Sequence, residues 1–143
     1  MQELIEFARA NPILSVAFVG LTLALVVTEV RRLFRGYKSV SPAQVTELMN
    51  RQDAVVVDLR GLAEFERGHI VGARHLLPSE ATPEHKVLAK AKEQPLVLVC
   101  AAGMTAPGIA EKLVKAGFKQ VHVLDGGVAA WQGASLPLVK GRA

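Results

Sequence analysis

Cys100 is the only cysteine in the 143-residue chain, and it comes directly after an apolar run, residues 95–99. A single cysteine excludes an internal disulfide bond and any Cys-x-x-Cys metal or redox pair. A free cysteine is often only a small buried hydrophobe that ends a strand. Whether Cys100 is such a structural residue or a nucleophile therefore depends on the residues around it.

The cysteine is followed by a segment of mostly small residues: Ala101, Ala102, Gly103, Met104 and Thr105. This segment leads into residues 105–117, which have the pattern of a helix. Unpaired N–H groups and the positive end of the dipole at a helix start favour an anion, which makes a thiolate there more nucleophilic. Gly103 allows successive N–H groups to point inward, and the two alanines leave room for a substrate. We therefore predict that Cys100 is a nucleophile whose thiolate or persulfide is held by the amides of residues 101–105.

Strands and helices alternate in the part of the chain that positions this loop. We predict strands at 54–59, 73–78, 95–100 and 120–125, and helical segments at 41–50, 62–68, 83–94, 105–117 and 126–133. Strands separated by helices need crossover connections, which predicts an α/β fold with one parallel sheet and helices on both faces. Ligands of such sheets bind beyond the carboxyl ends of the strands, and Cys100 lies at one of these ends.

Four further patterns stand out in this part of the chain: "VVVDLR" at 55–60, "EFERGHIVGARHLLP" at 64–78, the Cys-x-x-Gly-x-Thr loop at 100–105 and "VHVLDGGVAAW" at 121–131. Together these motifs resemble the rhodanese-like domain family. The resemblance runs from about Ser39 to Leu138. It implies a sulfurtransferase whose loop cysteine takes sulfane sulfur from a small donor, carries it as a persulfide and passes it to a thiol or protein acceptor.

The resemblance also implies roles for individual residues. Cys100 matches the nucleophile, residues 101–105 match the loop whose amides hold the persulfide, and Thr105 could add its hydroxyl. Asp58 and Arg60 match the family's Asp-x-Arg motif, with Asp58 in a supporting role. Arg60 could steer an anionic donor, or it could form a structural ion pair with Glu64 or a loop contact.

The loop departs from the family in the residues beside the cysteine. Loops that use thiosulfate well often carry cations where this chain has Ala101 and Ala102. A persulfide or another donor of low charge therefore fits better than thiosulfate. The cysteine phosphatases and arsenate reductases need an arginine at the end of a Cys-x5-Arg loop, but this chain has Ala106 there, which argues against that class.

Residues 10–28 contain no charge and, at ~1.5 Å per residue, would form a helix about 28 Å long, enough to span a bilayer. We predict a tail at 1–9, a transmembrane helix at 10–30, a basic linker at 31–38 and the rhodanese-like domain at 39–143. Lys and Arg residues are concentrated after the apolar run, which predicts a domain that faces the cytoplasm and is anchored by one span. With this span the chain resembles bacterial inner-membrane rhodanese-like proteins, which implies anchoring in the inner membrane.

The charge distribution and the histidine spacing argue against some classes of partner. The net charge of +4 is not concentrated in a basic block, so we expect no nucleic acid partner. The four histidines lack zinc spacing, so we expect neither a metal nor a cofactor. A protein partner at the membrane fits the anchor. The alternative to a sulfurtransferase is a non-catalytic rhodanese-fold domain that acts as a binding scaffold at the cytoplasmic face of the membrane.

Overall fold

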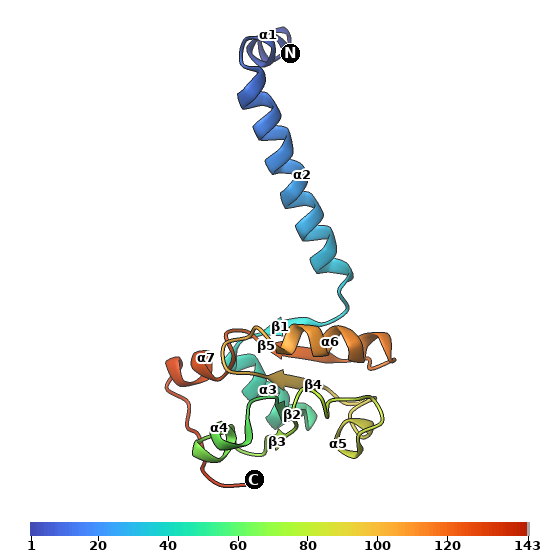
Figure 1. Ribbon diagram of the computed structural model, residues 1–143, viewed down its shortest axis with the longest axis vertical. Coiled ribbons are helices and arrows are strands. Elements are labelled where there is room, and N and C mark those ends of the chain that lie inside the picture. The colour runs from blue at the N-terminus through green and yellow to red at the C-terminus, as the bar shows by residue number, and fades with distance from the viewer. Residues whose placement is uncertain (143) are drawn as a thin grey trace. The chain divides into compact units, whose positions relative to one another are not determined.

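The computed structural model describes residues 1–142, and the chain divides into two compact units, Met1–Arg35 and the residues from Gly36 onward (Figure 1). The first unit contains α1 (Gln2–Ala10) and α2 (Pro12–Phe34). Neither helix has a buried residue. By length and composition, α2 could cross a membrane, with a mean hydropathy of 2.3 over its most apolar window.

This unit differs from the sequence prediction at both ends. The predicted tail at 1–9 forms the helix α1, and α2 continues past residue 30 to Phe34. Arg31 and Arg32 therefore lie in the last turn of α2 instead of in a linker. Basic side chains are favourable at this position because they face the negative end of the helix dipole.

The second unit is built on a parallel sheet, as the sequence predicts, and the sheet has five strands. Its strands are β1 (Lys38–Val40), β2 (Val55–Asp58), β3 (Arg74–His75), β4 (Leu96–Val99) and β5 (Val121–Leu124), in the order β1-β5-β4-β2-β3. The edge strand β1 is not among the predicted strands. Lys38 pairs with His122 in it, so the predicted boundary between linker and domain falls inside a strand.

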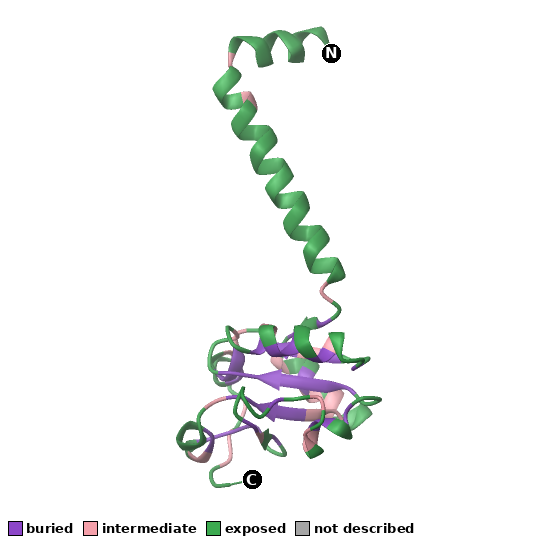
Figure 2. Ribbon diagram, turned by 45° about the vertical axis from the view of Figure 1, so that its right-hand side comes forward, coloured by how far each residue is buried: buried purple, intermediate pink, exposed green. Residues whose placement is uncertain are grey.

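Helices cover both faces of the sheet, because side chains of successive strand residues point to opposite faces. Val57, Leu98 and Val123 pack in one core cluster with Leu88 of α5 (Lys86–Ala89) and Leu113 of α6 (Ala106–Lys115). The opposite cluster contains side chains from α3 (Pro42–Gln52), α4 (Leu62–Arg67) and α7 (Gly127–Gly133), which are Val45, Phe65, Val128 and Trp131. Figure 2 shows the resulting buried central strands.

Local signals account for α3 but not for the length of α5. Ser41 and Gln44 form a capping box: Ser41 Oγ accepts from the Gln44 N–H, and Gln44 Oε1 accepts from the Ser41 N–H at 2.8 Å. The helix predicted at 83–94 shrinks to Lys86–Ala89. A polar segment that buries only Leu88 and Ala91 gains too little packing to stabilise a longer helix.

Candidate active site

Cys100 follows the last residue of β4 and lies at the carboxyl edge of the sheet. Its side chain is 4% exposed, and Sγ accepts a hydrogen bond from the Gly103 N–H at 3.1 Å. Four of the five residues that follow, all except the half-buried Gly103, are exposed. The loop residues are thus mostly exposed, whereas the sulfur that they follow is buried.

Gly103 occupies a conformation that other residues rarely adopt. Its φ is +83°, and a Cβ built on it would lie 3.1 Å from the Gly126 backbone nitrogen. The loop therefore needs glycine here both for its curl and for its close approach to the segment before α7. Thr105 precedes α6 with helical dihedral angles, and its side chain makes no capping hydrogen bond.

Backbone hydrogen bonds join the start of α7 to the cysteine loop. The Val128 N–H donates to Cys100 O at 2.9 Å, and the Ala129 N–H donates to Ala101 O at 3.2 Å. Since a peptide group is planar and trans, carbonyls that point at α7 turn the N–H groups of Ala101 and Ala102 away from it. The N–H groups of Ala101 and Ala102 therefore point away from α7, and the Gly103 N–H donates to Sγ.

Two glycines make this contact possible. Gly126 and Gly127 have φ values of +75° and +61°, and a Cβ on Gly127 would overlap Cys100 O. The sequence alone shows "DGG" only as part of the family motif and assigns neither glycine to the site. The consecutive glycines before a helix are the available signal, but Cys100, which Gly127 meets, lies 27 positions earlier in the chain.

Arg60 binds Asp58 and also makes a loop contact, which was one of the alternatives for it. Its guanidinium group binds Asp58 through Nε and Nη2, with the shortest contact at 2.8 Å, and Nη2 also donates to Gly68 O at 2.7 Å. Asp58 is 1% exposed and the Arg60 side chain 9%, so this is a buried ion pair. No ion pair joins Arg60 to Glu64 within residues 1–142; two of the three guanidinium nitrogens bind Asp58.

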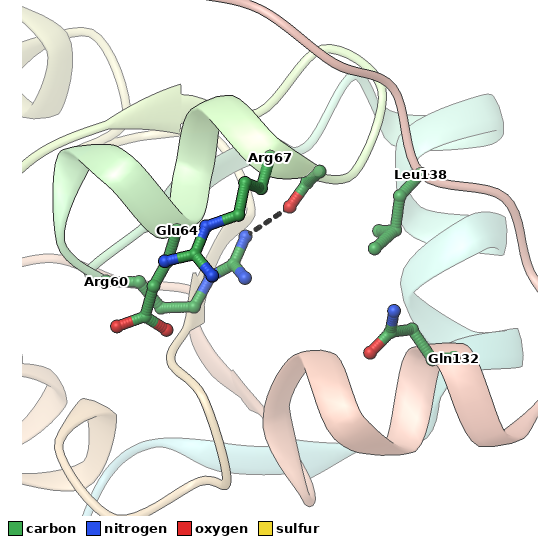
Figure 3. A pocket seen from close by; sticks show the side chains of 6 residues that line it. Arg60, Glu64, Arg67, Gln132 and Leu138 are labelled. Carbon is green, nitrogen blue, oxygen red and sulfur yellow. Dashed lines mark hydrogen bonds between the residues drawn. The ribbon is translucent and has the colours of Figure 1, made fainter.

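A cavity of about 210 Å³ opens beside Arg60. In Figure 3, Arg60, Glu64 and Arg67 gather on one side of the cavity, and Gln132 and Leu138 lie on the other. None of the loop residues 100–105 lines it. Among residues 1–142, no hydrogen bond joins the Arg60 side chain to that loop. Arg60 and the loop residues 100–105, which were predicted to form one site, therefore share neither a hydrogen bond nor this cavity.

The Asp58–Arg60 pair is expected to contribute strongly to stability. Asp58→Asn removes the charge that compensates a buried guanidinium group, and breaking such a pair costs about 3–5 kcal/mol. Urea unfolding of the full chain in detergent should show this decrease in the free energy of unfolding. The control Glu47→Gln, which breaks the exposed pair with Arg51, should change it by less than about 1 kcal/mol; equal effects would contradict the prediction.

Within residues 1–142, no group of three His, Cys, Asp or Glu side chains is placed to hold a metal ion. The arrangement at Cys100 consists of one thiol, a backbone N–H of Gly103 that donates to it, and the start of α7 bound to the loop carbonyls. A backbone N–H that donates to sulfur stabilises negative charge on that sulfur.

Comparison with known proteins gives consistent matches. Residues 41–134 match the rhodanese-like domain family. The Escherichia coli (strain K12) protein YibN, described as uncharacterized, is 44% identical over 143 residues, covering 99% of this chain and 100% of YibN. Thiosulfate sulfurtransferase GlpE from Pseudoalteromonas translucida is 39% identical over 98 residues, covering 68% of this chain and 91% of GlpE.

Solved structures show the same fold. A rhodanese-related protein from Thermoplasma volcanium matches with a TM-score of 0.61 and 25% identity, covering 72% of this chain and 98% of that protein. A thiosulfate sulfurtransferase from Pseudomonas aeruginosa matches with a TM-score of 0.64 and 24% identity. That match covers 75% of this chain and 20% of the longer Pseudomonas protein.

Proposed function

The chain belongs to the rhodanese-like domain family, and we propose that it is a membrane-anchored sulfurtransferase that carries sulfane sulfur as a persulfide of Cys100. The observation that supports this most is the orientation of the loop. Two of its carbonyls are bound by α7, and the Gly103 N–H donates to Sγ at 3.1 Å. A backbone amide that donates to the sulfur favours a persulfide, which is anionic at neutral pH.

The proposed reaction has two transfers. The Cys100 thiolate attacks the outer sulfur of a donor persulfide, so that a new S–S bond forms and the donor leaves as a thiolate. The thiolate of a small-molecule or protein acceptor then attacks the outer sulfur of the Cys100 persulfide, and the Cys100 thiolate is the leaving group. In this proposal Ala101, Ala102, Gly103, Met104 and Thr105 bind the transferred sulfur through their amides.

Arg60 and Asp58 have secondary parts in the proposal. Asp58 holds the guanidinium group at the carboxyl edge of the sheet, on the strand next to β4. The Nη1 group of Arg60 makes no hydrogen bond within the described residues, and Arg60 lines the cavity in Figure 3. We propose that it attracts anionic donors or acceptors toward this edge by its charge.

Intact-mass spectrometry tests the central claim. After incubation of the full chain in detergent with a low-molecular-weight persulfide, we expect a mass gain of one sulfur atom that a reducing thiol removes. Cys100→Ser should show no gain. Failure of the wild type to load, with its fold unchanged, would favour the non-catalytic scaffold over the sulfurtransferase.

We further propose that α2 anchors the protein in the inner membrane with the rhodanese-like domain in the cytoplasm. The helix is long and apolar enough to span a bilayer. Arg31, Arg32, Arg35 and Lys38 follow its apolar part, whereas only Arg9 precedes it. Cytoplasmic flanks carry such an excess of Lys and Arg.

Cysteine labelling in spheroplasts with a membrane-impermeant maleimide tests this orientation. Because Cys100 is buried, Met104, which is 87% exposed, is the better position for a reporter. On a Cys100→Ser background, Met104→Cys should react only after lysis, whereas Gln2→Cys should react with intact spheroplasts. The reverse pattern would overturn the orientation.

A further inference from the structure

The helix α1 has two chemically different faces. Leu4, Ile5, Phe7 and Ala8 follow one another at helical spacing and form an apolar face. The polar residues gather on the other side, namely Gln2, Glu3, Glu6 and Arg9. Leu4, Ile5 and Phe7 are 50% to 72% exposed, so the unit to which α1 belongs does not cover this face.

Side-chain hydrogen bonds set the corner between α1 and α2. Asn11, between the helices, has φ −129° and ψ 66°, and its Nδ2 donates to Phe7 O at 3.1 Å. Ser15 Oγ, in the first turn of α2, lies 3.2 Å from Ala8 O and 2.8 Å from Asn11 O and can donate to either. Carbonyls at the end of α1 are thus bound by side chains, and α1 turns away from the axis of α2 (Figure 1).

From these observations we propose that α1 lies in the plane of the membrane interface, with Leu4, Ile5 and Phe7 in the boundary between headgroups and acyl chains. The inference rests on the proposed membrane span of α2. The uncharged part of α2, residues 12–28, would span about 26 Å at ~1.5 Å per residue. Asn11 then lies at the membrane surface, and a helix that turns there follows the surface.

The charges of α1 indicate which lipid property matters. Glu3, Glu6 and Arg9 are its only charged side chains, so it lacks the basic face that draws helices to anionic lipids. Apolar burial is therefore the driving force. Binding of α1 should be similar on zwitterionic phosphatidylcholine and on anionic vesicles and should change little with salt.

Spin labelling of the full chain in phosphatidylcholine vesicles tests the proposal. On a Cys100→Ser background, single nitroxide labels are placed by Leu4→Cys and Phe7→Cys on the apolar face and by Gln2→Cys and Glu6→Cys on the polar face. Oxygen concentrates in the acyl region and a nickel chelate in water. We expect the oxygen-to-nickel accessibility ratio to be several-fold higher at positions 4 and 7 than at positions 2 and 6.

The alternatives give different patterns. High nickel accessibility at all four positions would place α1 in water, and low accessibility to both reagents at positions 4 and 7 would mean that protein covers them, for example a second copy. Either result overturns the proposal. A label at Leu21→Cys, mid-helix in α2, reports separately on the anchor: if it is not in lipid, the span and the inference both fail.

The corner provides a second test. Asn11→Ala with Ser15→Ala removes the side-chain donors to α1 and should reduce the difference in accessibility between the two faces. Thr22→Ala is the matched control, since the Thr22 hydroxyl donates to Phe18 O within α2 at 2.8 Å. An unchanged pattern in the double variant, identical to that of the control, would show that these hydrogen bonds do not set the position of α1.

Discussion

Replacing Gly127 with alanine is expected to slow persulfide loading of Cys100 by about a hundredfold, the cost of a misplacement near 1 Å. The added Cβ would overlap Cys100 O, and φ at this position is +61°, a conformation that alanine rarely adopts. The start of α7 must therefore move away from the loop. The hydrogen bonds from the Val128 and Ala129 N–H groups would be lost, and the loop amides would no longer be held in place.

The loading rate would be measured by intact mass against time, with far-UV circular dichroism as a check on the fold. Gly133→Ala is the matched control, because it lies in the same helix and its Cβ would meet nothing within 4 Å. Gly103→Val disturbs the packing between the loop and the start of α7 from the loop side, since its Cβ would lie 3.1 Å from the Gly126 nitrogen. Normal loading by both site variants with normal spectra would show that the amide arrangement is not required.

An arginine beside the cysteine is expected to improve thiosulfate as a donor by roughly ten- to a hundredfold. Ala101 and Ala102 are exposed, so a long side chain can be accommodated there without repacking the core. Directly beside the cysteine, the dianion otherwise meets backbone amides and a helix dipole worth about half a charge. A well-placed charged hydrogen bond adds about 1.5–3 kcal/mol, which corresponds to this change in specificity.

Thiosulfate:cyanide transfer would be compared for the wild type, Ala101→Arg and Ala102→Arg at two salt concentrations. The gain should shrink at high salt, because exposed charges are screened. Ala134→Arg, after the end of α7, adds the same net charge at a distance from the loop and should give no gain. Efficient transfer by the wild type, or equal gains in all three variants, would show that local charge does not set donor choice.

Features that depend on neighbouring residues in the chain could be predicted from the sequence. The β-branched run at 55–57 indicates a strand buried on both faces, and Ser41 and Pro42 indicate the start of α3. The position of Cys100 after a strand and before a helix follows from the same patterns. These predictions succeed because backbone preference, alternation and capping act over a few residues.

Contacts between distant segments were decided only by the tertiary structure. The edge strand β1 forms because β5 offers it a pairing partner, and three residues have too little pattern of their own to predict a strand. Arg60 is bound to Asp58 and Gly68 O rather than to Glu64, because burial at the strand end brings these groups together. Gly126 and Gly127 support Cys100 because parallel strands end at one edge of the sheet, which places residues 100 and 127 in contact although nothing in either local sequence specifies the other.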